Sequence, residues 1–312
     1  MHYFQKVLFV SFAQTDEENA LVQALSIAHV NQGSLKMLSL RPPFSGDMAC
    51  HENSYRQFLQ QISYEALARA RQLLNLSEQQ VQVEVDTELG NAPSARIIRH
   101  VLRDDYDLVI KAPESVDSGR GFQAVDMELL RKCPCPVWLS RPVNTPRRKV
   151  RIAVAVDPHT DTPEGHALSL HELRIARELS DVCDGDLRVV SCWDFPYEAY
   201  LRGNTWIELS DLQLTDEIRK AEDHNRRLLE LMITESAIGG RFVIHHIRGR
   251  PEEAIPVLIE QEGIHVLVMG TVARTGIPGF VMGNTAENIL QKLSCSLLAL
   301  KPPGFVSPVK AY

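Results

Sequence analysis

Two stretches of the chain resemble each other, and this likeness decides how the protein is organised. The first is YDLVIKAP (106–113) followed by ELLRKCPCPVWLSRP (128–142), and the second is IHVLVMGT (264–271) followed by NILQKLSCSLLALKP (288–302). Cys135 of the first stretch corresponds to Cys295 of the second, an offset of 160 residues in a chain of 312. A repeat of about half the chain predicts one domain duplicated in tandem, as residues 1–144 and 145–312.

Each copy is expected to alternate strands with helices. The expected strands are 6–12, 35–40, 81–85, 108–112 and 137–140 in the first copy, and 150–156, 187–193, 242–247, 266–270 and 297–300 in the second. The expected helices are 16–32, 54–75, 93–102 and 123–132, then 163–182, 212–236, 252–262 and 284–293, with an irregular insert before residue 212. Asp16 is the expected N-cap of the first helix and Gly33 its stop. This order predicts an α/β fold with a parallel sheet, helices on both faces, and ligands beyond the carboxyl ends of the strands.

A glycine-rich segment runs from Gly270 to the start of the last expected helix. Four of the 17 glycines (Gly270, Gly276, Gly279 and Gly283) fall within 14 residues. Glycines let a backbone approach a ligand closely, and the N–H groups of a first helical turn attract anions. Thr271, Arg274, Asn284 and Thr285 could add hydrogen-bond donors. The segment indicates an anion site, and the alternative is a tight connection with an ordinary Asn or Thr helix cap.

The same segment resembles the nucleotide loop of the universal stress protein family. In that loop Gly, two residues, Gly, nine residues, then Gly and Ser/Thr hold the phosphates of ATP, and Gly270 and Gly283 match it here. The expected strand that ends Val154-Ala-Val-Asp157, the turn Arg248-Gly249-Arg-Pro251 and the stretch RKCPCPV (131–137) match further. Between Gly249 and Pro302 the chain is particularly similar to the tandem, E-type members of the family.

The resemblance implies a fold and a ligand site. It implies two open, five-stranded, Rossmann-like domains of the adenine nucleotide alpha hydrolase-like type, which pair through 137–140 and 297–300 as an internal pseudo-dimer. Carried over by position, Asp157 would lie near the adenine or ribose of a nucleotide. The other residues implied at the site are Gly249, Gly270, Thr271, Arg274, Gly276, Gly279, Gly283, Asn284 and Thr285.

Two positions of the second copy depart from the family pattern. Ala273 stands at the second glycine, and Asn284 stands at the Ser/Thr position, although Thr285 follows. An alanine at positive φ costs about 1 kcal/mol, and a missing hydroxyl loses one hydrogen bond of roughly 0.5–1.5 kcal/mol. Together these changes weaken ATP binding about tenfold to several tens of times, without abolishing it.

The first copy has lost more of the pattern. Its first strand ends Phe12-Ala13-Gln14, without an Asp, and Asp126 is expected to cap the helix where the phosphates would lie. A carboxylate there would repel phosphate. We therefore predict that the first copy does not bind ATP, and acts as a scaffold or holds another ligand.

Composition excludes several functional classes. The net charge is −7, divided as −3 and −4 between the copies, so neither has the basic surface expected for nucleic-acid binding. No apolar run is long enough for a membrane span, and the N-terminus lacks the features of a secretory signal. The six cysteines are sparse, which indicates a reducing cytoplasm. The eleven histidines show no metal-ligand spacing, and no catalytic constellation is identifiable.

Three functions remain open from the sequence. The leading one is a cytoplasmic stress-response protein that binds a small ligand, with an adenine nucleotide such as ATP as the candidate for the second copy, and signals through protein partners rather than by catalysis. The second is a nucleotide switch with slow ATPase activity. The third is a structural interaction module without a ligand. The sequence leaves the partners and any further homodimer undefined.

Overall fold

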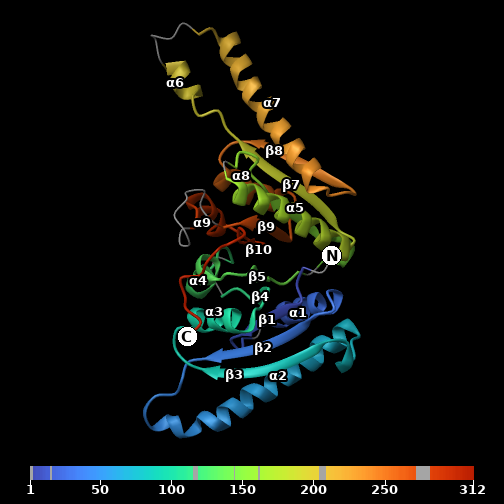
Figure 1. Ribbon diagram of the computed structural model, residues 1–312, viewed down its shortest axis with the longest axis vertical. Helices are drawn as coiled ribbons and strands as arrows, with labels where there is room; N and C mark the ends of the chain where they lie inside the picture. Colours follow the sequence, from blue (N-terminus) through green and yellow to red (C-terminus); the bar gives the residue numbers. More distant parts are fainter. Residues whose placement is uncertain are drawn as a thin grey trace.

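The structure of the chain is a computed structural model that describes residues 3–14, 16–114, 119–143, 145–160, 162–203, 209–271 and 282–312. Its strands form one ten-stranded sheet in the order β3-β2-β1-β4-β5-β10-β9-β6-β7-β8 (Figure 1). The first half of the sheet contains β1 (Lys6–Ser11), β2 (Ser34–Arg41), β3 (Gln82–Leu89), β4 (Leu108–Lys111) and β5 (Val137–Leu139). The second half contains β6 (Arg151–Ala155), β7 (Asp186–Trp193), β8 (Phe242–Arg248), β9 (Val266–Gly270) and β10 (Ser296–Leu300).

The two halves meet at the centre of the sheet. Neighbouring strands within each half are parallel, whereas β5 and β10 are antiparallel, with Leu297 opposite Leu139 and Leu298 opposite Trp138. The predicted fold class is therefore confirmed, and so is the predicted pairing of the two last strands. Each last strand is buried along its length, so this pairing also joins the hydrophobic cores of the halves.

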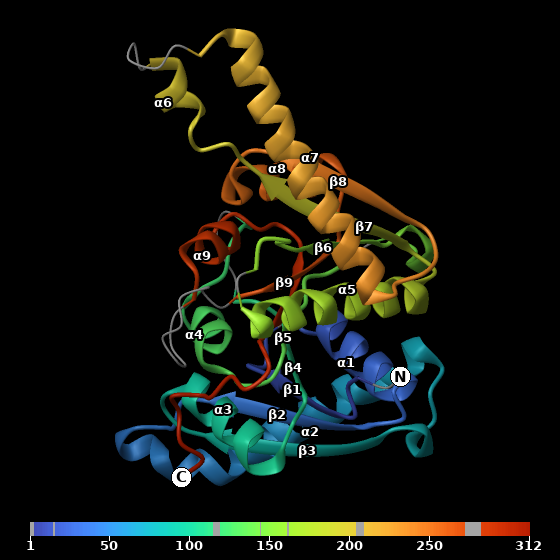
Figure 2. The same cartoon turned by 45° about the horizontal axis from the view of Figure 1, so that its top comes forward.

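Helices cover both faces of the sheet. One face carries α1 (Glu18–Val30), α2 (Glu52–Leu74), α5 (Pro163–Cys183) and α7 (Asp211–Ser236), and the other carries α3 (Pro93–Asp104), α4 (Ala124–Lys132), α8 (Pro251–Gln261) and α9 (Asn284–Leu290). The shorter elements are α6 (Glu198–Gly203) and the 3₁₀ turns Gly46–His51, Glu78–Gln80 and Arg147–Lys149. Each face has one continuous apolar core that runs through both halves. The insert predicted to be irregular thus contains a helix, α6, which projects beyond the sheet together with the adjoining part of α7 (Figures 1 and 2).

Local chemistry explains where several helices begin and end. Thr162 caps α5 by accepting a hydrogen bond from Gly165 N at 3.1 Å, and Pro163 occupies the first turn, where its missing N–H costs nothing. The predicted cap of α1 was wrong, because the N-cap position belongs to Glu17, whose carboxylate turns back toward β1. The left-handed residue that ends α1 is Gln32 (φ 53°) rather than Gly33. Gly33 is required for another reason: a Cβ there would lie 2.3 Å from the carbonyl oxygen of Gln5.

Polar contacts tie the halves together on the α4/α9 face. Arg131 of α4 forms an ion pair with Glu287 of α9, and Arg120 Nη2 lies 2.7 Å from Glu260 Oε1. The C-terminal segment returns to the first half, where the Ser307 hydroxyl donates to the carbonyl oxygen of Lys132 at 2.7 Å (Figure 1). Among the described residues, no helix combines the length and apolar character needed to cross a membrane.

Candidate functional site

The strand order reverses once in each half, and these two places are the positions where α/β sheets bind ligands. β1 lies between β4 and β2, and β6 lies between β9 and β7. We call the carboxyl ends of β1 and β4 the first switch point, and those of β6 and β9 the second switch point. At such a reversal the adjoining loops diverge to opposite faces of the sheet and leave a crevice. The comparison of the two switch points decides what each half can hold.

Asp157 and Gly270 lie side by side at the second switch point. Asp157 follows β6 by two residues, Gly270 ends β9, and the strands pair Ala155 with Met269. The Asp157 carboxylate is half-buried, and its Oδ1 accepts a hydrogen bond from His159 N at 2.9 Å. The topology therefore brings together two residues that are 113 positions apart in the chain.

A buried acid that the sequence analysis did not single out contacts the same place. Glu172 of α5 is only 3% exposed, and its carboxyl group accepts a hydrogen bond from the backbone N–H of Gly270. Burial raises the pKa of Glu172 well above the usual range for a glutamate, which favours the uncharged acid. The available signal was weak: Glu172 lies between Leu168 and Ala176 at four-residue spacing, on the apolar stripe of the helix.

Gly270 has no room for a side chain. A Cβ at this position would lie 2.7 Å from Glu172 Oε1 and 2.8 Å from Leu168 Cδ2. Both distances are shorter than real Cβ contacts. Close packing against α5 is thus sufficient to require a glycine at position 270, independently of any role in holding a ligand.

Thr271 is fully buried at the boundary between the halves. Its hydroxyl accepts from Lys301 Nζ at 2.7 Å and donates to the carbonyl oxygen of Leu130 at 3.3 Å. The Thr271 carbonyl oxygen accepts from Gly283 N at 3.2 Å. Burial lowers the pKa of Lys301 to about 8. The Thr271 hydroxyl is therefore engaged by the protein, and its predicted role as a ligand donor would require it to leave these partners.

The remaining predicted residues near α9 fall into two groups. Gly283 is the N-cap of α9, and Asn284 and Thr285 are exposed in its first turn. This helix has seven residues and ends at Leu290, earlier than the predicted residue 293, so its dipole is small. Arg274, Gly276 and Gly279 of the glycine-rich segment lie outside the described residues, as does Ala273.

Gly249 stands apart from Asp157. It follows β8, two strands from β6, which corresponds to roughly 10 Å across the sheet. Its φ of 138° favours glycine, and its N–H donates to the carbonyl oxygen of Trp193 at 2.9 Å. A Cβ at Gly249 would meet nothing within 4 Å, and the residue lines a cavity of about 310 Å³ over α8.

The first switch point is filled by the protein's own charged side chains. Lys111, at the end of β4, forms an ion pair with Asp126 of α4, and neither residue is exposed to solvent. Lys111 Nζ also donates to the carbonyl oxygen of Ala112 at 2.7 Å. The Glu17 carboxylate accepts from the Ser11 hydroxyl at 2.5 Å and from Phe12 N at 2.7 Å.

The first turn of α4 also has an internal anion. Glu114 Oε2 accepts a hydrogen bond from Val125 N at 2.9 Å, and Asp126 Oδ2 accepts one from Glu114 N at 2.9 Å. The expectation that Asp126 caps this helix was wrong, because the N-cap position belongs to Gln123 and the Asp126 carboxylate pairs with Lys111. Carboxylates of the chain thus lie at the start of α4, which is the place where the sequence predicted that a phosphate would be repelled.

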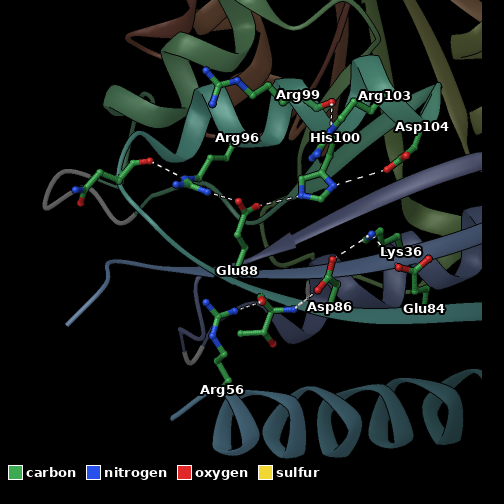
Figure 3. A network of polar contacts seen from close by, with 12 residues as sticks. Lys36, Arg56, Glu84, Asp86, Glu88, Arg96, Arg99, His100, Arg103 and Asp104 are labelled. Atoms are coloured by element: carbon green, nitrogen blue, oxygen red, sulfur yellow. Dashed lines mark hydrogen bonds and ion pairs between the residues drawn. The ribbon is translucent and has the colours of Figure 1, made fainter. Parts of the chain in front are cut away.

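A second covered position lies at the end of β3. Glu88 forms an ion pair with Arg96 and lies 3.1 Å from His100 Nε2, so that it joins β3 to two turns of α3 (Figure 3). The Arg96 guanidinium lies directly over Gly90, within 2.4 Å of where a Cβ would stand. Gly90 follows β3 as Gly249 follows β8, so the equivalent turn is closed by a side chain in the first half and open in the second.

Comparison with known proteins identifies the family. The model of the universal stress protein family matches residues 4–141 and again residues 150–301. The chain therefore belongs to the universal stress protein family and carries its domain twice.

Relatives with the same tandem arrangement match the chain from end to end. Universal stress protein E of Photorhabdus laumondii is 28% identical, over 100% of this chain and 99% of the relative. Universal stress protein E of Escherichia coli K12 is 29% identical, over 99% and 98%. Among solved structures, a protein of unknown function from Pseudomonas aeruginosa PAO1 is similar, with a TM-score of 0.70 at 24% identity. The match covers 96% of this chain and 94% of that protein's chain. A universal stress protein from Archaeoglobus fulgidus has a TM-score of 0.60 at 15% identity, over 95% of this chain and 98% of its own. These structures show the shared fold.

Proposed function

We propose that this protein is a cytoplasmic stress-response protein whose second half binds one adenine nucleotide, ATP in the first instance, and which acts through protein partners. The site would be the second switch point, with Asp157 toward the sugar or base and the glycine-rich segment toward the phosphates. The first half would not bind nucleotide and would serve as the pairing partner of the second. The division into residues 1–144 and 145–312 is part of this proposal.

One contrast carries the proposal. The ion pair Lys111–Asp126 fills the first switch point, whereas the positions that correspond to it in the second half hold Met269 and Ala286. Met269 corresponds to Lys111 because Ala155 pairs with Met269 as Val10 pairs with Lys111. At these two described positions the second switch point therefore has neither the cation nor the anion that would compete with a nucleotide in the first.

Binding without hydrolysis is favoured over an ATPase. Hydrolysis needs an ionised base or a metal-held water close to the phosphates. Glu172 is the buried acid that contacts Gly270, and its raised pKa favours the protonated form, which cannot accept a proton.

Isothermal titration of the full-length protein with ATP tests the proposal. We expect one nucleotide per chain, and we expect Asp157→Ala to weaken binding about tenfold, as for the loss of a charge-assisted hydrogen bond. The matched control is Asp186→Ala, which removes the same charge from the exposed amino end of β7. The switch point lies at the other, carboxyl ends of the strands. Absence of binding at millimolar ATP, two sites per chain, or equal effects of the two substitutions would each overturn it.

A further inference from the structure

The structure has a cavity between the two halves that the nucleotide proposal does not use. Its volume is about 470 Å³, and its lining residues come from α1 of the first half and α5 of the second, among other segments. Figure 2 shows these two helices next to each other. Residues that precede β1 and β6, such as Phe4 and Val150, also line it. This places part of the cavity at the amino ends of the strands, away from the switch points. Both repeats build its wall, so an isolated half would not contain it.

The lining of the cavity is mostly apolar. Aliphatic and aromatic side chains come from the facing helices and from the sheet beneath them, among them Val22, Ile27, Trp138, Leu179 and Val182. A volume of this size falls within the range of small-molecule sites, which are largely apolar with a few polar groups that set orientation. Val22 and Leu179 are only partly buried, which leaves the space between the helices accessible from the surface.

Two buried polar atoms in residues of this wall have no partner, Trp138 Nε1 and Arg141 Nε. Trp138 of β5 is 3% exposed, and its indole Nε1–H makes no hydrogen bond to any described residue. The same side chain lines the cavity and belongs to the apolar core under α1 and α5. Buried N–H groups are nearly always satisfied, so an orphaned one beside a cavity indicates that an acceptor is absent.

The charges around the cavity favour an uncharged occupant. Two acids of α5, Glu178 and Asp181, line it, and the pKa of Tyr3 is raised by burial and by the nearby Glu178. The cation in the lining is Arg141, whose Nη1 and Nη2 donate to the carbonyl oxygens of Gly119 at 3.1 Å and Gly121 at 2.7 Å, while its Nε has no partner. An anionic ligand such as a free carboxylate would face Glu178 and also Asp181, which pairs with Arg177 Nη2 at 2.6 Å. It would find Arg141 with two of its three nitrogens already engaged.

We propose that this cavity binds a neutral, mostly apolar small molecule that carries one hydrogen-bond acceptor, such as a ketone, ester or quinone oxygen, and that the acceptor bonds to the indole N–H of Trp138. The ligand would contact both repeats and stabilise their association. The site is separate from the nucleotide site, and neither depends on the other.

Two neutral fluorescent probes test the proposal on the full-length protein. Prodan carries a ketone oxygen, and diphenylhexatriene is a hydrocarbon without an acceptor. We expect saturable binding of both, one per chain, unaffected by millimolar ATP. Leu179→Trp, which fills the cavity, should weaken both at least tenfold, and Val22→Trp from the facing helix should do the same. The control is Leu231→Trp on α7, where leucine is 66% exposed and outside the cavity.

Trp138→Phe separates the role of the N–H from that of the ring. This substitution should weaken prodan about fivefold to tenfold through the lost hydrogen bond, and should change diphenylhexatriene less than twofold. Circular dichroism melting of each variant confirms that it is folded. The proposal that the cavity binds a ligand would be refuted if neither probe bound saturably. It would also be refuted if neither Leu179→Trp nor Val22→Trp reduced binding. Equal losses of both probes in Trp138→Phe would refute the assigned hydrogen bond.

Discussion

The two halves of this protein share one topology and differ at the place where that topology offers a ligand site. At the first switch point Lys111 and Asp126 are buried against each other, and Glu17 and Glu114 occupy nearby backbone N–H groups. At the second, Met269 and Ala286 replace the ion pair, and the buried acid is Glu172, whose pKa favours the uncharged form.

The difference shows how a duplicated domain can fill one of its two switch points with its own side chains without changing its fold. A buried ion pair need not add stability, because desolvation of both charges offsets their attraction. It does fill the crevice with groups that no nucleotide can easily displace. Four substitutions test this comparison between the halves.

The largest effect is expected from Lys111→Met, which copies the residue of the second half into the first. It leaves the Asp126 carboxylate buried and without its cation, so we expect a loss of about 3–5 kcal/mol in the free energy of unfolding. Urea denaturation of the full chain measures it. Adding Asp126→Ala, so that both positions match the second half, should recover most of the loss. A double variant as unstable as the single one would show that the comparison of these positions is wrong.

Lys301 and Arg141 follow the two pairing strands at equivalent positions, and only the lysine can titrate near neutral pH. Burial lowers the pKa of Lys301 to about 8 from 10.5, so between these values the unfolded chain binds one proton more and stability rises with pH. Relative to the Lys301→Met variant, the free energy of unfolding of the protein should rise by at most about 3 kcal/mol over this pH range.

Denaturation midpoints between pH 7 and 10.5 measure that gain. Both proteins should carry Cys133→Ala, because the Cys133 thiol interacts electrostatically with Lys301 and its own pKa is lowered by the neighbouring Cys135. Parallel pH profiles for the two proteins would contradict the lowered pKa.

Gly270→Ala should destabilise the second half by about 1–3 kcal/mol, because its Cβ would force Glu172 and Leu168 to move. The matched change is Ala112→Gly, the reverse exchange at the corresponding position of the first half. Only the loss typical of replacing alanine by glycine, about 0.5–1 kcal/mol, is expected at Ala112, which directly follows β4. Thermal unfolding of both variants, followed by calorimetry, compares them. A larger effect at Ala112 would mean that the packing against α5 does not explain Gly270.

The smallest effect is expected at the turn after β3. Arg96→Ala uncovers Gly90 and removes a partly exposed ion pair, so we expect a loss of about 0.5–1 kcal/mol. Arg99→Ala, an exposed position on the same helix, is the control and should be neutral. Hydrogen exchange of the Gly90 N–H, which donates to the carbonyl oxygen of Arg41 at 2.8 Å, reports the opening directly. Unchanged exchange would indicate that Arg96 does not close this turn.

Much of the fold was predictable because it rests on local patterns. Strands such as Val266–Gly270 are short apolar runs, and helices such as Pro93–Asp104 begin with proline, so their positions agree with the expectation to within a few residues. The errors came where a side chain has a partner outside its own helix. Asp16 had the right chemistry for a cap, but Glu17 holds the cap position and bonds Ser11 at the end of β1 and Phe12 directly after it, five to six residues back in the chain.

The candidate site was less accessible to prediction. Lys111 lies at the end of an otherwise apolar strand, which signals that a buried cation needs a partner, but nothing in the chain identifies Asp126 as that partner. Glu172 lies on a helix with charged neighbours, where a glutamate is ordinarily solvated. Its contact with Gly270 spans 98 residues and depends on how α5 crosses β9.

The amino-acid sequence by itself determined the duplication and the alternation of strands and helices, because these follow from periodicity and from a repeat 160 residues apart. The pairing of the last strands was implied by the resemblance to the family. Only the tertiary structure decided which switch point is filled, and that the halves enclose a cavity between α1 and α5. Both properties depend on contacts between residues that only the folded sheet brings together. At the first switch point two opposite charges compensate each other, whereas between α1 and α5 the side chains leave space.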